Sequence, residues 1–313
     1  MARYLASRLA GMVIVMLLVT ALVFVITRLA PGDPAAVMLG EQATAADIAQ
    51  LRASYGLDKP LPVQFAYWLG ELARGNLGQS IFLQRPVTQA LLERAEPTFF
   101  LTLFSMVIAI SIGIPFGIAA AVWRNGVVDQ AFSGFAMLGA SIPSFWLGLI
   151  LMQLFAVGLG WFPVAGYGDP GAPLSDRLHH LVLPAIVLGV VNSALILRFS
   201  RATMLDVLGE DHIRTARAKG VSERRVVLHH ALRNALIPVV TVVGLTFALL
   251  IGGAIVTETV FGLPGIGNLV VSAVLRRDYP VIQGALLVIA GLYVLINLLI
   301  DLLYLAIDPR VKY

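Results

Sequence analysis

The sequence contains no cysteine and few charged residues. Without cysteine the chain forms no disulfide, no thiolate nucleophile and no cysteine metal site, and it carries no indication of a redox compartment. Only 13% of its 313 residues are charged, whereas a soluble domain has roughly a quarter. With 58% hydrophobic residues and a mean hydropathy of +0.87, the composition indicates an integral membrane protein.

Sequence motifs of nucleotide binding and of catalysis are also missing. There is no G-x-x-x-x-G-K-[ST] phosphate loop, so this chain does not bind ATP in that way. There is no H-E-x-x-H, and we interpret the adjacent His179 and His180 as interfacial residues rather than as metal ligands. We predict no catalytic residue and no metal site. The net charge of +4 is small and its placement fits a membrane topology, so we expect no nucleic-acid partner.

Six apolar stretches are long enough to cross a bilayer, which requires about 20 residues per helix. They are Leu9–Thr27, Thr98–Val122, Phe132–Val157, Leu181–Leu197, Ala235–Thr257 and Val281–Ile307. The first is longer than the apolar core of a signal peptide, and the residues after it form a poor cleavage site, so we expect it to remain as a span. The predicted fold class is an all-α polytopic membrane protein.

Basic residues are distributed unevenly between the loops. With the N-terminus inside, thirteen lysines and arginines lie on the cytoplasmic side and three lie in the two short outer loops. The long first loop holds the other six, but loops of that length say little about orientation. We therefore predict cytoplasmic termini, an N-terminal segment and first span over residues 1–30, an extracytoplasmic helical loop over 31–97, and a five-helix core over 98–313 with a cytoplasmic loop at 198–234.

The predicted outer loop has patterns of short amphipathic helices. Thr44 is a candidate helix N-cap with Asp47 three residues later, and Gly56 is a candidate stop. A second helix has an apolar face of period 3.6 that ends before Gly75, formed by Phe65, Trp68, Leu69 and Leu72. A shorter pattern follows at Val87, Ala90 and Leu91. Two roles stay open for this loop, a docking surface for an external partner and a structural cap.

A polar segment between two apolar spans runs from Arg198 to Asn234 and contains eight of the 22 basic residues. Glu210 precedes Arg214 by four residues, a spacing that supports a short helix, and Gly220 is expected to end it. Ser222 is a candidate cap for a second helix, whose apolar stripe is Leu228, Ala231, Leu232 and Ala235. Such a segment either anchors the chain to anionic lipid or, through its small residues, presents a surface to another protein.

One sequence resemblance decides between these two roles. The motif R-T-A-R-A-K-G at 214–220, followed by H-A-L-R-N-A-L-I-P at 230–238, resembles the EAA loop of permease subunits of bacterial ABC importers, in the version of the peptide/nickel/glutathione permease family. Further motifs follow in the family's order along the whole chain: F-V-I-T-R-L-A-P-G-D-P-A (24–35), Y-G-L-D-K-P-L-P (55–62), G-N-L-G-Q-S (75–80), R-P-V (85–87), F-G-L-P-G-I-G (261–267), R-D-Y-P-V-I-Q (277–283) and D-P-R-V (308–311). One departure is Arg214-Thr215-Ala216 in place of Glu-Ala-Ala, so a salt bridge through the motif's glutamate is not expected here.

This resemblance implies a type I ABC importer permease fold with six transmembrane helices and a cytoplasmic coupling helix, in a bacterial inner membrane. The implied partners are membrane lipid, a second homologous permease subunit, two ATP-binding subunits that use ATP and Mg, and an extracytoplasmic substrate-binding protein; this chain itself is expected to bind no cofactor. The residues expected to couple to the ATPase are Glu210, Asp211, Ile213, Arg214, Thr215, Ala216, Arg217, Ala218, Lys219 and Gly220. Peptides are the first expectation for cargo, with glutathione and nickel chelates as alternatives.

The translocation path is indicated only by polar or helix-breaking residues within the spans. The candidates are Ser141, Pro143, Ser144, Gln153 and Asn192. The scarcity of ionisable groups argues against a proton-coupled carrier or a selective channel. A pore or scaffold protein without ATP coupling is the runner-up, and an intramembrane hydrolase is third. Gly113 and Gly117 form a G-x-x-x-G that would let two helices pack closely.

Overall fold

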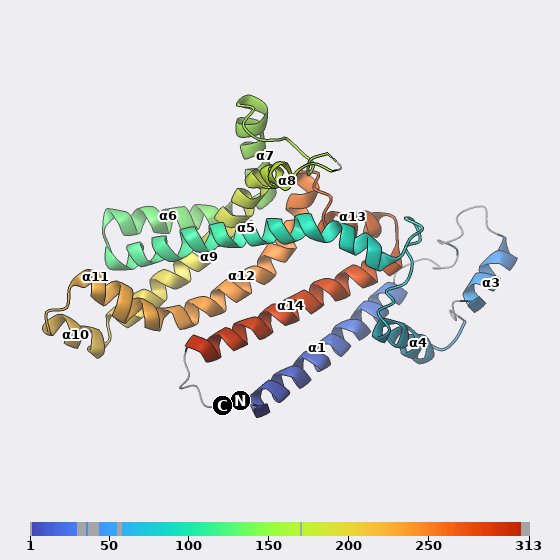
Figure 1. Cartoon of the computed structure of the whole chain (residues 1–313), viewed down its shortest axis with the longest axis horizontal. Coiled ribbons are helices and arrows are strands. Elements are labelled where there is room, and N and C mark those ends of the chain that lie inside the picture. Colours follow the sequence, from blue (N-terminus) through green and yellow to red (C-terminus); the bar gives the residue numbers. More distant parts are fainter. Residues whose placement is uncertain (1, 30–35, 37–43, 55–57, 170, 308–313) are drawn as a thin grey trace. The chain divides into compact units, whose positions relative to one another are not determined.

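The computed structural model describes residues 2–29, 36, 44–54, 58–169 and 171–307 of the chain (Figure 1). This part is mainly helical and has no β-strand, only an isolated bridge between Gln79 and Pro86. The α-helices are α1 (Ala2–Leu29), α3 (Ala45–Ser54), α4 (Leu61–Ala73), α5 (Val87–Val122), α6 (Val127–Ser141), α7 (Ser144–Leu151), α8 (Leu174–His180), α9 (Val182–Leu208), α10 (Asp211–Ala218), α11 (Glu223–Arg225), α12 (Leu232–Val260), α13 (Ile266–Leu275) and α14 (Tyr279–Ile307). Two π-helical segments are η1 (Met152–Gly158) and η2 (Val226–Ala231).

Five predicted spans correspond to helices long and apolar enough to cross a membrane, namely α1, α5, α9, α12 and α14. This confirms the prediction of an all-α polytopic protein. The helices extend beyond the apolar stretches, because polar residues continue them at the ends. In particular, the pattern at Val87, Ala90 and Leu91, expected to be a short separate helix, forms the first turns of α5, which continues through Pro97 and Pro115.

The remaining predicted span, Phe132–Val157, is broken into α6 and α7, whose axes differ by 102° (Figure 1). The break lies at Ile142 and Pro143. A residue before proline is forced out of the α region, and Ile142 accordingly adopts an extended ψ of 122°. Pro143 then occupies the N-cap position of α7, where its missing N–H costs no helical hydrogen bond. The pair is either one broken span or a re-entrant segment.

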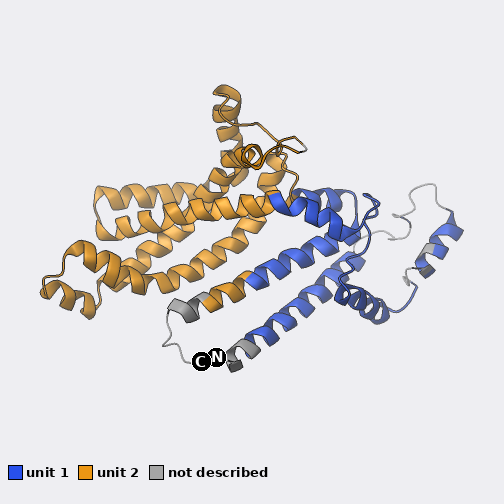
Figure 2. Cartoon of the chain, in the orientation of Figure 1, with its two compact units in different colours: residues 1–96, 268–295 blue, residues 97–267, 296–313 orange. Residues whose placement is uncertain are grey.

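Two compact units make up the chain (Figure 2). Residues 1–96 and 268–295 form unit 1, and residues 97–267 and 296–313 form unit 2. The first boundary lies at the end of the predicted outer loop. The sequence did not indicate that residues 268–295 would group with the N-terminal part. The expected division into 1–30, 31–97 and 98–313 concerns membrane sidedness and stays a prediction.

Unit 1 contains the amphipathic helices expected in residues 31–97. Thr44 and Asp47 cap α3 reciprocally, because the Asp47 amide donates to Thr44 Oγ1 (3.2 Å) while the Thr44 amide and hydroxyl donate to the Asp47 carboxylate (3.1 and 2.6 Å). The bond from the Thr44 hydroxyl, followed by that from its amide, lowers the pKa of Asp47. The predicted stop at Gly56 lies outside the described residues, whereas Gly75 adopts a φ of +79° just after α4, as expected for a helix stop.

The apolar face predicted for α4 packs as expected. The rings of Phe65 and Trp68 lie against buried Phe24 of α1, with centroids 5.3 and 5.7 Å away. Leu69 and Leu72 line an apolar groove between α1, α4 and α14. The face therefore holds α4 on the first span.

A buried carboxylate organises the turn before α5. Asp278 is 2% exposed and accepts the Ser80 hydroxyl at 2.5 Å and the amides of Ile81 and Phe82 at 3.2 and 3.1 Å. Arg276 lies over the Phe82 ring, 3.7 Å from its centroid. Three donors satisfy the carboxylate, which is the condition for burying a charge at low cost.

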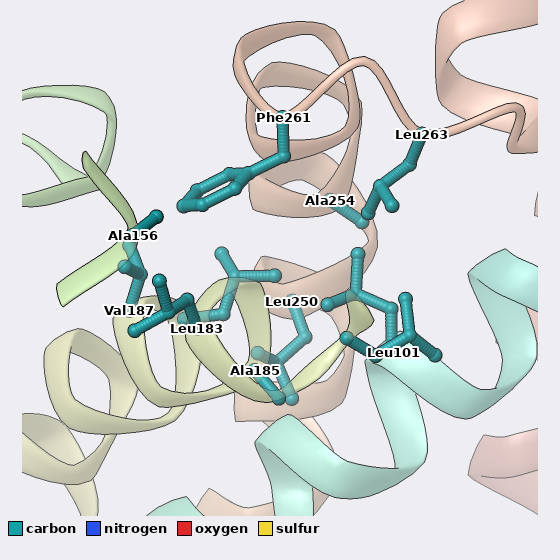
Figure 3. Packing of buried hydrophobic residues seen from close by; sticks show 11 residues of the cluster. Leu101, Ala156, Leu183, Ala185, Val187, Leu250, Ala254, Phe261 and Leu263 are labelled. Atoms are coloured by element: carbon teal, nitrogen blue, oxygen red, sulfur yellow. The ribbon is translucent and has the colours of Figure 1, made fainter. Parts of the chain in front are cut away.

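Unit 2 has its apolar core around the first half of α9 (Figure 3). Side chains of α9 meet those of α5, of α12 and of the turn after α12, and the shared cluster includes Leu101, Leu183, Ala185, Leu250, Ala254, Phe261 and Leu263. The predicted G-x-x-x-G in α5 makes the close approach to α9. A Cβ on Gly113 would lie 2.7 Å from Ile196 Cβ, and one on Gly117 would lie 2.6 Å from the Leu197 carbonyl oxygen. The prediction of close helix packing at these glycines is thus confirmed.

Candidate functional site

The predicted coupling segment forms α10, a helix of eight residues that connects α9 to the helical run leading into α12. Ile213 is completely buried and anchors α10 in a cluster with Met204 and Val207 of α9 and Val226 of η2. Gly220 ends the helical turn with a φ of +75°, as predicted, because a residue with Cβ adopts this conformation only with strain. The helix is therefore held firmly on one side and exposed on the other.

Charged residues of α10 lie on its exposed face, but two of the three predicted cations are already paired. The Arg217 guanidinium donates two bonds to the Glu223 carboxylate, at 2.6 and 3.1 Å. Arg214 pairs with Asp211 at 3.3 Å. The pair expected between Arg214 and Glu210 is wrong. Glu210 lies at the N-cap, outside the helix.

Three further details of this segment differ from the sequence prediction. The Glu210 carboxylate contacts His212 Nδ1 at 3.0 Å. Ala216, expected on the docking surface, packs partly into the buried cluster, whereas Thr215, Ala218 and Lys219 stay exposed. Ser222 occupies the predicted N-cap position without a capping bond from its side chain.

The apolar stripe predicted after Gly220 is partly wrong because of the π-helical segment. A π turn holds more residues than an α turn, so it shifts the positions that follow. Leu228 is 51% exposed, and Val226 and Val227 are buried in its place. Ala231 and Ala235 are buried as predicted.

The five candidate path residues do not gather in one place. Ser141, Pro143 and Ser144 lie at the break between α6 and α7. Gln153 is exposed in η1, and Asn192 of α9 donates to the carbonyl oxygen of Leu188 at 2.8 Å. One of them, Ser141, lines a cavity of about 440 Å³ between α6 and α9, whose other lining residues are Ser133, Met137, Ala140, Leu197, Arg198 and Arg201.

Sequence reasoning missed an ion pair between α6 and α9. Arg201 Nε donates to Asp129 Oδ1 at 2.6 Å and Arg201 Nη2 donates to Asp129 Oδ2 at 2.8 Å. The Asn125 amide and the Ser133 hydroxyl complete the shell at 2.9 and 3.2 Å. Arg201 had been assigned to the cytoplasmic loop, but α9 continues as a helix past it. A carboxylate and an arginine 72 residues apart carry no sequence pattern that would have revealed their contact.

A second missed group is Glu258 at the end of α12, which is completely buried. Its carboxylate accepts the Thr98 hydroxyl at 2.6 Å, and Thr98 Oγ1 accepts the Ile266 amide at 2.8 Å. Glycine is required above it, because a Cβ on Gly265 would overlap the carboxylate and one on Gly267 would lie 2.9 Å from Oε2. The motif F-G-L-P-G-I-G therefore has a physical role as the cover of a buried carboxylate.

Replacing Thr98 with valine is expected to destabilise this loop. The substitution removes one donor to a buried carboxylate and the acceptor of the Ile266 amide, and unsatisfied buried groups cost about 1–3 kcal/mol each. Thr102→Val is the matched control, because the buried Thr102 hydroxyl donates only to a backbone carbonyl of its own helix. Thermal unfolding of the purified complex should show a clear loss for Thr98→Val and a smaller one for the control; equal losses would contradict a special role for Thr98.

The described residues form five apolar helices long enough to span a membrane, one bent helix pair, and a short charged helix held between α9 and α12. Together with the matches that follow, this arrangement is the fold of a type I ABC importer permease. Residues 113–313 match the family described as "Binding-protein-dependent transport system inner membrane component", and residues 1–102 match the corresponding N-terminal family. The chain belongs to this family. It is a permease subunit of an ABC importer and not an enzyme.

Several curated relatives align over the whole chain. The probable peptide ABC transporter permease y4tP of Sinorhizobium fredii is 48% identical over 311 residues, 99% of each chain. The glutathione transport permease GsiC of Pectobacterium atrosepticum is 49% identical over 313 residues, 100% of each chain. Among solved structures, the inward-facing MetNI methionine ABC transporter matches with a TM-score of 0.59 and 21% identity, over 70% of this chain and 97% of that one. This last likeness concerns the fold alone.

Membership in this family has consequences for partners and cofactors. It implies a partner permease, ATPase subunits and a binding protein, and permease subunits of ABC importers bind no cofactor themselves. Among the described residues, no three histidine or acidic side chains are grouped as metal ligands.

Proposed function

We propose that this chain is one of two non-identical permease subunits that together form the path of a bacterial peptide importer. Coupling to an ATPase is supported by one observation about α10. Buried Ile213 anchors this short helix, and its charged side chains are exposed. In this proposal α10 docks on one of two ATPase subunits, which use ATP and Mg. Their cycle of binding and hydrolysis drives the permease pair between outward- and inward-facing states.

Peptide cargo is supported by the relative y4tP, and glutathione is the second candidate because the relative GsiC is named for it. Both cargoes are short chains with amide groups and free carboxylates, so one path can suit either. A nickel chelate is the third. Cells that carry the complete transporter should take up a labelled dipeptide, and excess unlabelled dipeptide should compete more strongly than glutathione. If glutathione competed more strongly than the dipeptide, glutathione would be the assigned cargo.

The proposed topology places both termini and residues 201–233 on the cytoplasmic side of a bacterial inner membrane. Because the natural sequence has no cysteine, single cysteines can test it. Ser222→Cys replaces an exposed residue of the predicted cytoplasmic segment, and Ala66→Cys replaces an exposed residue of α4 in the predicted outer loop. Ser80 is unsuitable, because it is 2% exposed and bonded to Asp278.

An impermeant thiol reagent added to intact cells is expected to label the cysteine at position 66 and not the one at position 222. After the cells are opened, both should react. Labelling at position 222 in intact cells would contradict the orientation. The thirteen basic residues inside against three in the short outer loops motivate this expectation.

A further inference from the structure

The cavity between α6 and α9 contains two arginines of α9, Arg198 and Arg201. Its volume is about 440 Å³, and Arg198 and Arg201 line it with the hydroxyl groups of Ser133 and Ser141. The two helices lie side by side within unit 2 (Figure 1). No residue of this cavity except Ser141 was assigned a role on the path from sequence.

The depth of the cavity follows from α6. Trp123 is 58% exposed in the turn before α6, the kind of residue that lies at a membrane interface. From Val127, Ser133 lies roughly 9 Å and Ser141 roughly 21 Å along the helix at 1.5 Å per residue. Since the hydrocarbon core is about 30 Å thick, the cavity extends from near one interface towards the middle.

Helix packing places Arg198 within this depth. Arg201 pairs with Asp129 near the start of α6, and Gly139 lies close to Ala194 near its end. Arg198 lies between these two levels on α9. An arginine at such a depth normally faces a partner or a water-filled cavity, because exposure of the charge to lipid is costly.

The two arginines differ in charge balance. Asp129 neutralises Arg201 through both carboxylate oxygens and holds it in place. Arg198 is exposed and has no ion pair or hydrogen bond among the described residues. The cavity therefore has one positive charge without a described protein partner beside a fixed ion pair.

The chemistry of the remaining wall suits the end of a peptide. A guanidinium binds a carboxylate, like a phosphate, through two parallel charge-assisted hydrogen bonds, and a peptide offers the carboxylate at its C-terminus. Met137, Ala140 and Leu197 supply apolar surface for a side chain. The Ser141 hydroxyl donates to the Met137 carbonyl oxygen at 2.8 Å and keeps lone pairs that can accept a peptide N–H.

We propose that this cavity is a carboxylate-binding station on the translocation path, in which Arg198 pairs with the C-terminal carboxylate of the peptide. This proposal rests on the proposed function as a peptide permease. Arg201 and Asp129 are positioning residues that keep the wall from collapsing.

The test uses Ala140→Cys as a probe, since Ala140 is exposed and lines the cavity in a chain without cysteine. The complete transporter is reconstituted in vesicles, and the rate of modification by an impermeant maleimide is measured from the cytoplasmic side. A dipeptide with a free carboxylate is expected to slow modification, and the same dipeptide as a C-terminal amide is not. Arg198→Gln should weaken this protection on the order of tenfold, the size of one charge-assisted contact, and Arg198→Lys should retain part of it.

Arg124→Gln is the matched control, an exposed arginine in the turn before α6 that does not line the cavity. The proposed carboxylate-binding station is contradicted if the dipeptide and its C-terminal amide slow modification of the cysteine at position 140 equally. It is also contradicted if the dipeptide slows modification as strongly in the Arg198→Gln variant. A cysteine at position 140 that never reacts with the maleimide would also contradict the station, because a partner subunit or a lipid would then cover the cavity. Uptake of the dipeptide is followed in the same vesicles: uptake without protection refutes the station alone, and no uptake refutes the peptide function and the station with it.

Discussion

Changing Arg214, Arg217 and Lys219 together to glutamate is expected to abolish ATP-driven uptake while the membrane helices stay folded. Arg214 and Arg217 lie on the exposed face of α10 and Lys219 is the exposed residue that follows it, and none of them belongs to the cluster that buries Ile213. An unpaired or like charge that loses water in an interface costs about 2–5 kcal/mol, enough to reduce coupling by more than tenfold. Uptake and ATP hydrolysis are measured on the assembled transporter.

A steric change tests the same face without altering charge. Ala218→Trp adds bulk at an exposed helical position, and Gln130→Trp adds the same bulk at an exposed position of α6. Gly220 is a poor choice, because its φ of +75° would strain any other residue. We expect the change at Ala218 to block uptake and the change at Gln130 to have little effect. If the triple glutamate variant kept its ATPase subunits and the normal uptake rate, the assignment of α10 would be wrong.

Replacing Arg201 with leucine is expected to destabilise unit 2 strongly. The substitution leaves the Asp129 carboxylate, whose side chain is only 6% exposed, without its main partner. Breaking a buried pair in this way costs about 3–5 kcal/mol. Asp129→Leu should cost less, because the Arg201 side chain is 29% exposed and can turn to water.

The double variant Asp129→Leu with Arg201→Leu separates the pair from its surroundings. We expect it to be more stable than Arg201→Leu alone, since no buried charge is left unpaired. Thermal unfolding of the purified transporter, monitored by the loss of monodisperse complex, measures all three variants. Additive losses in the double variant would show that the two side chains do not stabilise each other.

Apolar composition and motif order predicted most of the fold. Long apolar stretches without charged residues predict transmembrane helices. In the bilayer core only helices or closed barrels satisfy the hydrogen bonds of the backbone N–H and C=O groups. The glycines at 113 and 117 revealed close packing of α5, since their spacing places both on one helix face. Pro143 revealed an interruption of the third span, but not the 102° bend, which depends on what α7 packs against.

The buried charges could not be predicted in the same way. Asp129 and Glu258 lie just outside the apolar runs used to define spans, and only the packing of the folded helices shows that they are buried. Their partners are 72 and 160 residues away along the chain. The register after Gly220 failed for a different reason, because an α-helical period does not anticipate a π-helical segment.

Reconstitution of the complete transporter tests the central claim most directly. Vesicles that contain this chain, its partner permease and the ATPase subunits are supplied with the binding protein, a labelled dipeptide and ATP with Mg. The account predicts accumulation above equilibrium that requires the binding protein and ATP together, and that stops in the triple glutamate variant of α10. Equilibration of the dipeptide at the same rate without ATP or binding protein would instead show a pore without coupling, and would contradict the account.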